Sequence, residues 1–472
     1  RDRLRSRGLG DVYKRQLLVM GFATIRKWKG TRCWHIIIAV LAALTLMVLS
    51  GYYGDELVTE YMAVVITMLF ILVYGILLLL LKIAPKKMRI ALREAAFCVA
   101  IAELAVNMAV TGLGVTSRVA YTDKQGYYED LLQQAKEDNG NDGFYRVEDS
   151  GRKTKNDDSL YGYRSATIFS SLMNLDVSHL FQSLYMEGGK NFYCYNGASP
   201  LPSAMFSVKY MLSSNPVDES PLRTLVGSNN GNYLYRNNYC LPLGYMMSEK
   251  AIKGWESSML DRIGSLNSLA QQLGAKGDML YPATCTQSQA AGDTTIDISE
   301  DGYYYADYVT CNADSLTVSR DDGWTQQYGK TTHRYLLDLG ECKAGTKVHI
   351  TNLNAETIEY HVYRLNFKAM CTAYETLSEQ TMSLEKMTDR RIVGSIDVRQ
   401  AGRLILSVPA DEGWSLYVDG KKTKIKPFAD ALIGVHLKEG THKIELRYTT
   451  PGVQIGAAIS IAAVSYTHLT LP

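Results

Sequence analysis

Long apolar runs separated by short charged segments fill the first quarter of the chain. Three runs, at about residues 33–54, 58–83 and 91–115, each approach the roughly 20 mainly apolar residues that a membrane-spanning helix requires. Beyond residue 116 the apolar segments become short and polar residues separate them. This pattern predicts transmembrane helices within residues 17–115, followed by a large polar region.

Charges in the short loops predict the orientation of these helices. Lys and Arg precede the first run and fill the loop between the second and third, whereas the loop between the first and second contains Asp55, Glu56 and Glu60 and neither Lys nor Arg. The positive-inside rule places that acidic loop outside the membrane. Residues 116–450 then also lie outside, and the protein is predicted to be multi-pass.

The periodicity changes within the external region. Residues 116–279 mix loops, short strands and one predicted helix at 248–273, which Ser248 can cap. After about residue 280 apolar and polar positions alternate in short segments, as in HKIELRYT (442–449), which is typical of an antiparallel sandwich. Asp419-Gly420 predicts a type I′ hairpin turn. The predicted fold class is therefore a membrane all-α helical bundle, an extracytoplasmic α/β region and an antiparallel β-sandwich over 280–450.

Both ends of the chain differ in character from the rest. Residues 1–16 and 464–472 read as non-native tails, and residues 451–463 begin a further apolar helix that stops short of a full span. We therefore expect the chain to be an internal piece of a larger membrane protein.

Composition adds few constraints. A net charge of +2 over 472 residues gives no argument for a nucleic-acid partner, and we predict none. No CxxC or His/Cys ligand spacing occurs, so no metal site is expected. Six of the eight cysteines lie in the external region, where either up to three disulfides or free buried thiols are compatible with the spacing: Cys194, Cys240, Cys285, Cys311, Cys342 and Cys371.

Two blocks of sequence resemble the YfhO family of bacterial membrane proteins. In residues 405–460 the matching features are a strand ending in Pro, a Gly-Trp pair, a Val-Asp-Gly-Lys hairpin, a Gly-x-His-x-Ile-Glu strand and a Tyr-x-x-Pro-Gly entry into a helix: Pro409, Gly413-Trp414, Val418 to Lys421, Gly440 to Glu445 and Tyr448 to Gly452. The second block consists of FYRVED (144–149) with segments 156–174, 192–214 and 240–247. Residues 254–274 depart from the family pattern.

The resemblance implies a polytopic protein similar to GT-C type glycosyltransferases in the bacterial plasma membrane. Such a protein would move a sugar from a polyprenyl-phosphate donor to a cell-envelope polymer such as lipoteichoic acid. Its partners would be the lipid bilayer, the lipid-linked sugar and the glycopolymer, with no further cofactor evident. The resemblance also implies that the main catalytic region lies outside this chain.

Three carboxylates are candidates for catalysis. Glu103 lies in the middle of the third predicted span, where a carboxylate marks a functional site, although a Glu bonded to Asn107 and linking helices would explain it equally. Asp55 and Glu56 lie on the external side, where either could act as the base that activates an acceptor hydroxyl. Acidic residues are also common in external loops, which leaves their role open.

Tyrosine clusters are candidates for glycan binding. Tyr161 and Tyr163 form one cluster and Tyr304 and Tyr305 belong to another, and their rings could stack on sugars. Tyr is equally a normal half-buried strand residue. A non-catalytic envelope protein that binds or scaffolds glycan is therefore the alternative function, and a transporter is a third possibility.

Overall fold

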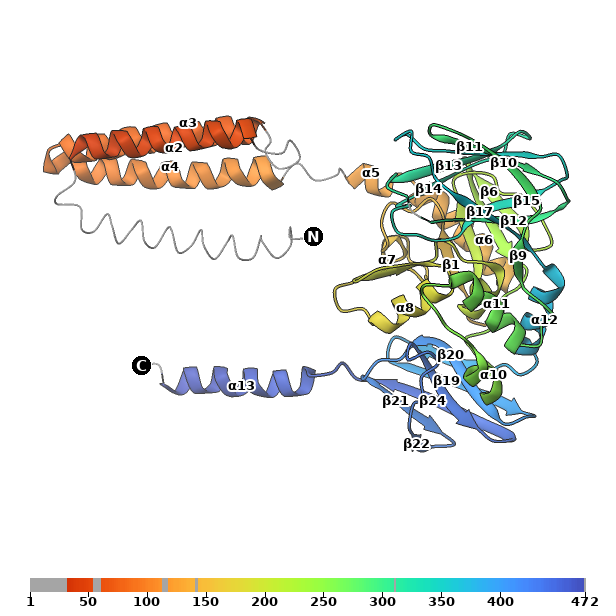
Figure 1. The fold of residues 1–472 in the computed structure, drawn as a ribbon. Helices are drawn as coiled ribbons and strands as arrows, with labels where there is room; N and C mark the ends of the chain where they lie inside the picture. The colour runs from red at the N-terminus through yellow and green to blue at the C-terminus, as the bar shows by residue number, and fades with distance from the viewer. Residues whose placement is uncertain (1–31, 54–60, 113–117, 141–142, 310, 471–472) are drawn as a thin grey trace. The chain divides into compact units, whose positions relative to one another are not determined.

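A computed structural model describes residues 32–53, 61–112, 118–140, 143–309 and 311–470 of the chain. The chain divides into two compact units, Arg1–Tyr121 and Thr122–Pro472 (Figure 1). The first unit is helical and the second contains all the strands of the described part.

Three long helices make up most of the described part of the first unit: α2 (Cys33–Tyr53), α3 (Tyr61–Ile83) and α4 (Lys86–Gly112). α2 packs closely on α3 at Gly75, where an added Cβ would lie only 2.7 Å from Cγ2 of Val40. A residue without a side chain lets two helix backbones approach each other, as in many membrane-helix pairs.

The predicted membrane all-α bundle is wrong as the fold class of this chain. About a third of the chain is helical and a third is strand, mostly in antiparallel sheets. Among the described residues only Val64–Ile83 is long and apolar enough to span a membrane, because the described apolar part of α2 is limited to Cys33–Leu49 and the first turns of α4 contain Lys86 and several further charges. The three crossings predicted from apolar runs therefore stay a prediction.

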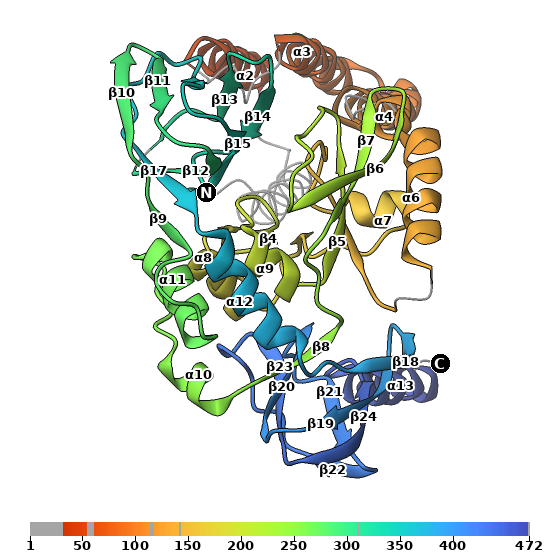
Figure 2. The same cartoon turned by 90° about the vertical axis from the view of Figure 1, so that its right-hand side faces the viewer.

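A four-stranded sheet begins the second unit. Its order is β1-β5-β7-β6, in which β1 and β5 are parallel and the other neighbours are antiparallel: β1 (Arg146–Asp149), β5 (Val208–Ser213), β7 (Asn232–Asn237) and β6 (Arg223–Asn229). The helix α6 (Gln125–Asn139) covers one face of this sheet (Figure 2). Its apolar stripe of Tyr128, Leu131 and Ala135 packs on the strands, as helical spacing allows.

Short helices and a three-stranded sheet, β2-β4-β3, surround the largest core of this unit. The strands are β2 (Ile168–Phe169), β4 (Phe192–Cys194) and β3 (Glu187–Gly188). The helices around this core are α8 (Leu175–Ser183), α9 (Pro200–Met205), α10 (Glu249–Gly254), α11 (Arg262–Gln272) and α12 (Phe367–Ser378). The short α5 (Arg118–Thr122) leads from the first unit into the second, and α7 (Asp157–Tyr161) packs near α6.

The single helix predicted at 248–273 is divided into α10 and α11. Ser248 caps α10 by accepting a hydrogen bond from the Ala251 backbone N–H at 3.1 Å, as predicted. α10 then ends at Gly254, the next residue is extended, and Asp261 caps a second helix by accepting from Gly264 N–H at 2.9 Å. The helical periodicity of the apolar residues gave no sign of the break between α10 and α11.

Two antiparallel sheets enclose a core rich in tyrosine, and we call this part the tyrosine-rich sandwich. One sheet has the order β10-β11-β16-β13-β14: β10 (Cys285–Ala290), β11 (Asp293–Ile298), β16 (Lys347–Thr351), β13 (Ser315–Arg320) and β14 (Thr325–Gly329). The other has the order β15-β12-β17-β9: β15 (Leu337–Cys342), β12 (Gly302–Tyr308), β17 (Tyr360–Leu365) and β9 (Leu280–Pro282).

Two further antiparallel sheets form the C-terminal sandwich around an aliphatic core. One has the order β18-β19-β24-β21-β22: β18 (Ser383–Thr388), β19 (Arg391–Val398), β24 (Gly440–Tyr448), β21 (Trp414–Val418) and β22 (Lys421–Thr423). The other has the order β23-β20-β8: β23 (Leu432–Leu437), β20 (Gly402–Pro409) and β8 (Gly244–Met247). The predicted strands of 280–450 thus belong to four sheets with two cores, and α13 (Val453–Thr470) follows β24.

Candidate functional site

A cleft of about 100 Å³ lies beside the tyrosine-rich sandwich. Strands β6, β12, β14 and β15, together with the segments after β1 and β4, contribute its walls. Five aromatic residues line it: Tyr195, Tyr303, Tyr305, Trp324 and Tyr328. Polar side chains between them come from Arg152, Asn196, Asp218, Arg223, Gln326 and Asp338.

The alternation of β12 decides which of its tyrosines face the cleft. Tyr303 and Tyr305 lie on the cleft side, whereas Tyr304 lies in the core of the tyrosine-rich sandwich, because successive strand residues point to opposite faces. The hydroxyl of Tyr304 donates to the carbonyl oxygen of Glu300 at 2.6 Å. Of the two predicted glycan-binding tyrosines of this strand, only Tyr305 lines the cleft.

Arg223, Tyr303 and Asp338 form a hydrogen-bonded triangle in the cleft wall. Nη1 of Arg223 donates to Oδ2 of Asp338 at 3.0 Å and to the hydroxyl of Tyr303 at 3.1 Å, and that hydroxyl donates to Oδ2 at 2.8 Å. Burial opposes the charge of Arg223, but the Tyr303 oxygen and the Asp338 carboxylate keep the pKa of its guanidinium well above the ordinary value. The triangle is a fixed polar surface.

The two cleft carboxylates are both paired with arginines. Asp338 pairs with Arg223, and Oδ2 of Asp218 lies 2.7 Å from Nη1 of Arg320, whose guanidinium stacks 4.7 Å from the centroid of the Trp324 ring. Among the described residues that line the cleft, no carboxylate is left without a cationic partner. This arrangement suits hydrogen bonding to a neutral, hydroxyl-rich ligand better than proton transfer.

Three polar atoms of the cleft have no hydrogen-bond partner within the described part of the protein. The two that are donors are the hydroxyl of Tyr305, a residue only 1% exposed, and Nε1 of Trp324, and a third atom, Oδ2 of Asp218, has the ion pair with Arg320. Burial raises the pKa of Tyr305 well above its ordinary value, so its hydroxyl stays protonated and can donate. Buried polar groups are normally hydrogen-bonded, and two such donors in one cleft are what a bound polar ligand would satisfy.

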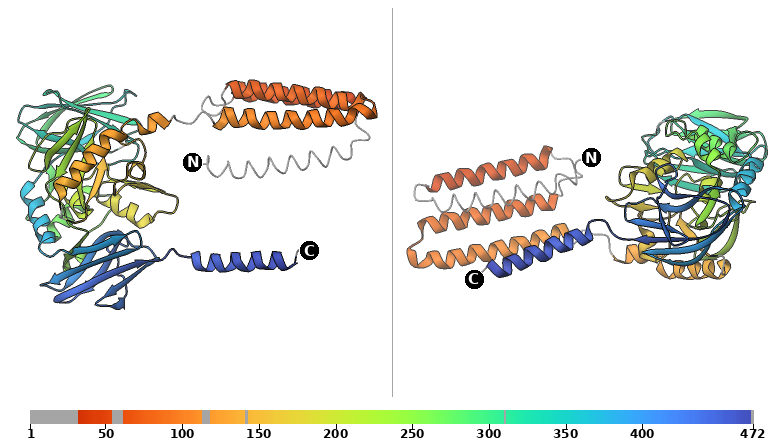
Figure 3. Two further views of the ribbon diagram at one scale, coloured as in Figure 1. Left: turned by 180° about the vertical axis from the view of Figure 1, so that it is seen from behind. Right: turned by 90° about the horizontal axis from the view of Figure 1, so that it is seen from below.

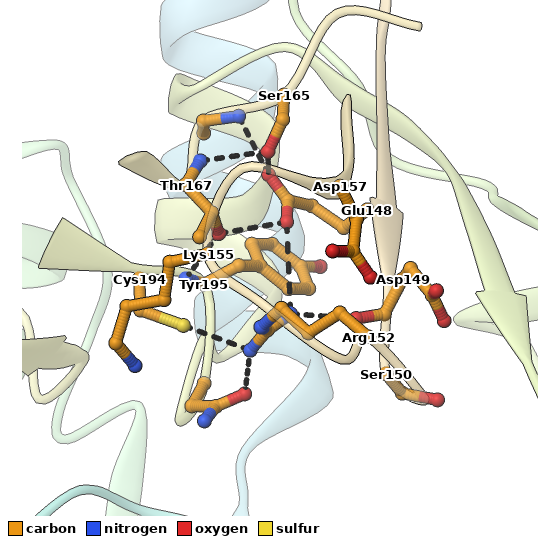
Figure 4. A network of polar contacts seen from close by, with 12 residues as sticks. Glu148, Asp149, Ser150, Arg152, Lys155, Asp157, Ser165, Thr167, Cys194 and Tyr195 are labelled. Atoms are coloured by element: carbon orange, nitrogen blue, oxygen red, sulfur yellow. Dashed lines mark hydrogen bonds and ion pairs between the residues drawn. The ribbon is translucent and has the colours of Figure 1, made fainter. Parts of the chain in front are cut away.

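The polar network around Arg152 fixes the part of the cleft wall that Arg152 and Asn196 contribute (Figure 4). Nη1 of Arg152 donates to the carbonyl oxygen of Asp149 at 2.6 Å, and Nη2 lies 2.8 Å from Sγ of Cys194 and bonds to Oδ1 of Asn196. Glu148 is buried, with Oε2 3.9 Å from Nη1 of Arg152. Three groups donate to its carboxylate at 2.6–2.8 Å: Ser165 Oγ, Ala166 N–H and Thr167 Oγ1.

Glu187 links this network to the tyrosine-rich sandwich. Its Oε1 accepts from Nζ of Lys155 at 2.8 Å and lies 2.9 Å from Nδ1 of His333, and its Oε2 accepts from Asn196 Nδ2 at 2.7 Å. Burial acts to raise the pKa of the Glu187 carboxyl, but the His333 bond and the Lys155 charge outweigh it and lower the pKa to about 2. The carboxylate therefore stays ionised and holds Asn196 in the cleft wall.

Tyr161 and Tyr163 lie away from the cleft. Tyr161 is buried in the core between α6 and the first sheet, where its ring centroid is 5.0 Å from that of Tyr128. Tyr163 packs against the same core. Their role as glycan-binding residues stays a prediction, and the structure separates them from Tyr305.

Glu103 contacts a neighbouring helix. Its Oε2 accepts a hydrogen bond from the hydroxyl of Tyr74 on α3 at 2.6 Å. The side chain of Asn107, its predicted partner, lies outside the described residues, as do Asp55 and Glu56. Glu103 thus links α4 to α3, and its catalytic role stays a prediction together with those of Asp55 and Glu56.

The sequence did not single out the arginines and aspartates of the cleft. Arg152 lies in a segment that reads as a polar loop, and Arg223 and Asp338 lie in strands separated by more than 100 residues. Alternation along β12 is the one local signal that could have separated Tyr305 from Tyr304. All eight cysteines are free thiols, and burial raises the pKa of Cys194.

An apolar helix of spanning length followed by a large β-rich unit is the plan of a membrane protein with an extensive region outside the lipid. The sequence model described as "Bacterial membrane protein YfhO" matches residues 16–460. The chain therefore belongs to the YfhO family of bacterial membrane proteins.

A curated relative is the uncharacterized protein YfhO of Bacillus subtilis (strain 168), 22% identical over 352 residues. The match covers 64% of this chain and 40% of that protein, so the chain spans less than half of its relative's length. Among solved structures, a cupin 2 conserved barrel domain protein from Leptotrichia buccalis is 11% identical, with a TM-score of 0.10, over 36% of this chain and 91% of that one. The β-glucosidase DesR from Streptomyces venezuelae is 9% identical, with a TM-score of 0.12, over 36% and 42%. Such low TM-scores say nothing about fold.

Proposed function

We propose that this chain is part of a membrane glycosyltransferase that moves a sugar from a polyprenyl-phosphate donor to a cell-envelope polymer such as lipoteichoic acid. Within that activity the cleft beside the tyrosine-rich sandwich binds the glycan acceptor. Membership of the YfhO family supports a membrane location. The chemistry of the cleft supports the glycan.

One observation carries the glycan assignment: the cleft combines aromatic faces with buried donors that lack partners. Tyr303, Tyr305 and Tyr328 supply flat rings, while the Tyr305 hydroxyl and Nε1 of Trp324 supply the free donors. Sugars present both C–H faces, which stack on aromatic rings, and hydroxyls, which accept from such donors. The pairing of both carboxylates with arginines favours a ligand that is neutral where it enters the cleft.

In this proposal the sugar transfer requires the full-length protein. The cleft has no carboxylate free of an arginine among its described residues, and the chain spans 40% of its B. subtilis relative. A general base would come from outside the cleft, either from Glu103, Asp55 or Glu56 or from the region that this chain does not include. The alternative, a non-catalytic protein that binds or scaffolds glycan in the envelope, shares the same cleft.

Binding is tested with a pair of tyrosine variants in the full-length protein. Tyr305→Phe removes the unpartnered hydroxyl in the cleft, and Tyr360→Phe removes another buried, unpartnered hydroxyl in the core of the tyrosine-rich sandwich. Titration with purified lipoteichoic acid, followed by tryptophan fluorescence because Trp324 lines the cleft, should show binding weakened about fivefold in Tyr305→Phe, as expected for one lost hydrogen bond. Binding should be unchanged in Tyr360→Phe, and equal affinity for both variants would contradict the assignment.

Transfer is tested in membranes that contain the full-length protein, wild type or Glu103→Gln. Labelled sugar on a polyprenyl-phosphate donor should appear in the endogenous polymer with the wild type. Loss of transfer in Glu103→Gln would assign Glu103 to the reaction, whereas unchanged transfer would leave it as the Tyr74 partner that links two helices. Glycan binding without transfer from any donor would favour the scaffold.

A further inference from the structure

The loop between β2 and α8 presents apolar side chains to the surroundings. We call residues 168–175, IFSSLMNL, the apolar loop, and this segment contains no charged residue. Leu172 at its tip is 94% exposed, and Phe169 and Leu175 on either side are 45% and 46% exposed. Adjacent apolar side chains left open in this way mark a surface that contacts a partner or a membrane.

Hydrogen bonds hold the apolar loop in this shape. Ser170 N–H donates to the carbonyl oxygen of Asn191 at 2.9 Å, and Oγ of Ser170 accepts from Leu172 N–H at 3.1 Å. At the base of the loop, Asn156 accepts from the backbone N–H of Phe169 at 2.9 Å and donates to its carbonyl at 3.0 Å. Leu172 is therefore exposed because the turn directs it outward.

Further hydrogen bonds connect the apolar loop to the point at which the chain enters α13. Nδ2 of Asn174 donates to the carbonyl oxygen of Ala410 at 2.8 Å. Three residues later, the carbonyl of Gly413 accepts from Thr449 N–H at 2.9 Å, directly after β24. Figures 1 and 3 show the apolar loop and the beginning of α13 on the same side of the second unit.

The segment that leads into α13 has features typical of the boundary between membrane and water. The described apolar residues of α13 are open to the surroundings, with Ile455 and Ile461 70% and 68% exposed. Just before the helix, Trp414 and Tyr448 pack ring against ring with centroids 4.9 Å apart. Trp and Tyr concentrate at the level of lipid head groups, where an apolar body and a polar tip are both accommodated.

We propose that the apolar loop inserts into the surface of the lipid bilayer beside α13. Besides its link to the helices of the first unit, the second unit then has two attachments of its own to the membrane: α13, and Leu172 with Phe169 and Leu175. Exposed charges of both signs lie nearby, among them Asp176, Asp411 and Lys190, so the proposal requires no anionic lipid. Two attachments fix the orientation of the second unit at the surface. A single helix joined by a short link does not fix it.

Three matched variants of the full-length protein test this proposal. Leu172→Trp places a fluorophore at the tip of the apolar loop, and Leu260→Trp and Leu353→Trp place it at two other leucines that are 93% and 95% exposed. Each protein is reconstituted in phosphatidylcholine vesicles with or without brominated acyl chains. The emission added by each new tryptophan is then measured as the difference from the wild type.

The added emission of Leu172→Trp should shift to the blue and be quenched by the brominated lipid, because bromine in the acyl chains quenches only a ring that enters the bilayer. The two controls should emit as in water and keep their intensity. Water-like, unquenched emission from all three variants would overturn the proposal. A blue shift of Leu172→Trp without bromine quenching would also overturn it, because the loop would then be covered by protein.

Discussion

The two sandwiches of the second unit share an architecture and differ in what fills them. The tyrosine-rich sandwich buries the rings of Tyr304, Tyr308, Tyr335 and Tyr360 between its sheets. The C-terminal sandwich buries aliphatic side chains at the equivalent place between its sheets, such as Leu406, Leu416, Ile433, Ile444 and Leu446. Both cores are apolar, but only the first contains many side chains that end in a polar atom.

Because of this difference, the tyrosine-rich sandwich is suited to ligand recognition and the C-terminal sandwich to attachment through α13. A buried tyrosine needs an acceptor, and Tyr308 and Tyr335 find theirs in the carbonyl oxygens of Thr331 at 3.0 Å and Gly329 at 2.7 Å. Strand β12, which places Tyr304 and Tyr308 in this core, presents Tyr303 and Tyr305 to the cleft on its other face. Ser407 and Pro409 of β20 and Leu432 of β23 line part of a separate cleft of about 140 Å³, and strand β24 leads into α13.

The largest expected effect tests whether the aliphatic core holds the C-terminal sandwich together. Leu446→Ala removes a fully buried side chain from β24 and should lower the free energy of unfolding by about 4 kcal/mol, through lost burial and the cavity left behind. Arg447→Ala, at the next and outward-facing position, should change it by less than about 0.5 kcal/mol. Denaturant unfolding in detergent measures both. A similar loss in the two variants would contradict the assigned core.

A pH experiment contrasts the two regions next. The pKa of Glu187 is lowered from 4.5 to about 2, so its ionisation stabilises the folded state above about pH 4.5, and this stabilisation is lost as the pH falls toward 2. The contribution is ~3 kcal/mol, and Glu187→Gln should remove that part of the pH dependence. In the C-terminal sandwich, Glu445→Gln serves as the control, because Glu445 is paired with Arg447 at the surface and solvent screens the pair. Equal pH profiles for Glu187→Gln and the wild type would contradict the buried pairing.

The smallest expected effect concerns one turn of the C-terminal sandwich. Gly420 has a φ of 76° and open space around it, so Gly420→Ala should cost about 1 kcal/mol from backbone strain alone. Gly126→Ala on α6 also meets open space, but its backbone is helical, and this change should stabilise by up to about 1 kcal/mol. Thermal unfolding of the two variants should therefore shift in opposite directions. Shifts of the same sign would contradict the left-handed turn.

Local patterns predicted the local structure well. Asp419 and Gly420 both have positive φ between β21 and β22, as a type I′ hairpin requires, and this prediction is confirmed. The alternation in β24 buries Ile444 and Leu446 and exposes Lys443 and Arg447, also as predicted. Such features depend on residues within a few positions of one another, and the sequence states them directly.

The pairing of strands into sheets could not be predicted from the same patterns. β8 pairs with β20 across more than 150 residues, and alternation alone gives no partner for either strand. For this reason strands predicted as one sandwich belong to four sheets. In the first unit, Lys86, Lys87, Arg89 and Arg93 were predicted to lie in the loop between two runs, whereas they belong to the first turns of α4.

The resemblance of two sequence blocks indicated the YfhO family, and short-range spacing predicted the helical and β-rich regions and the hairpin at Asp419-Gly420. Only the tertiary structure decided that Arg223 and Asp338 meet beside Tyr305, that both cleft carboxylates are paired with arginines, and that Asn174 bonds the apolar loop to the turn between β20 and β21. These contacts join residues tens to hundreds of positions apart. Their formation depends on which strands pair and which faces pack, and no local periodicity encodes that choice.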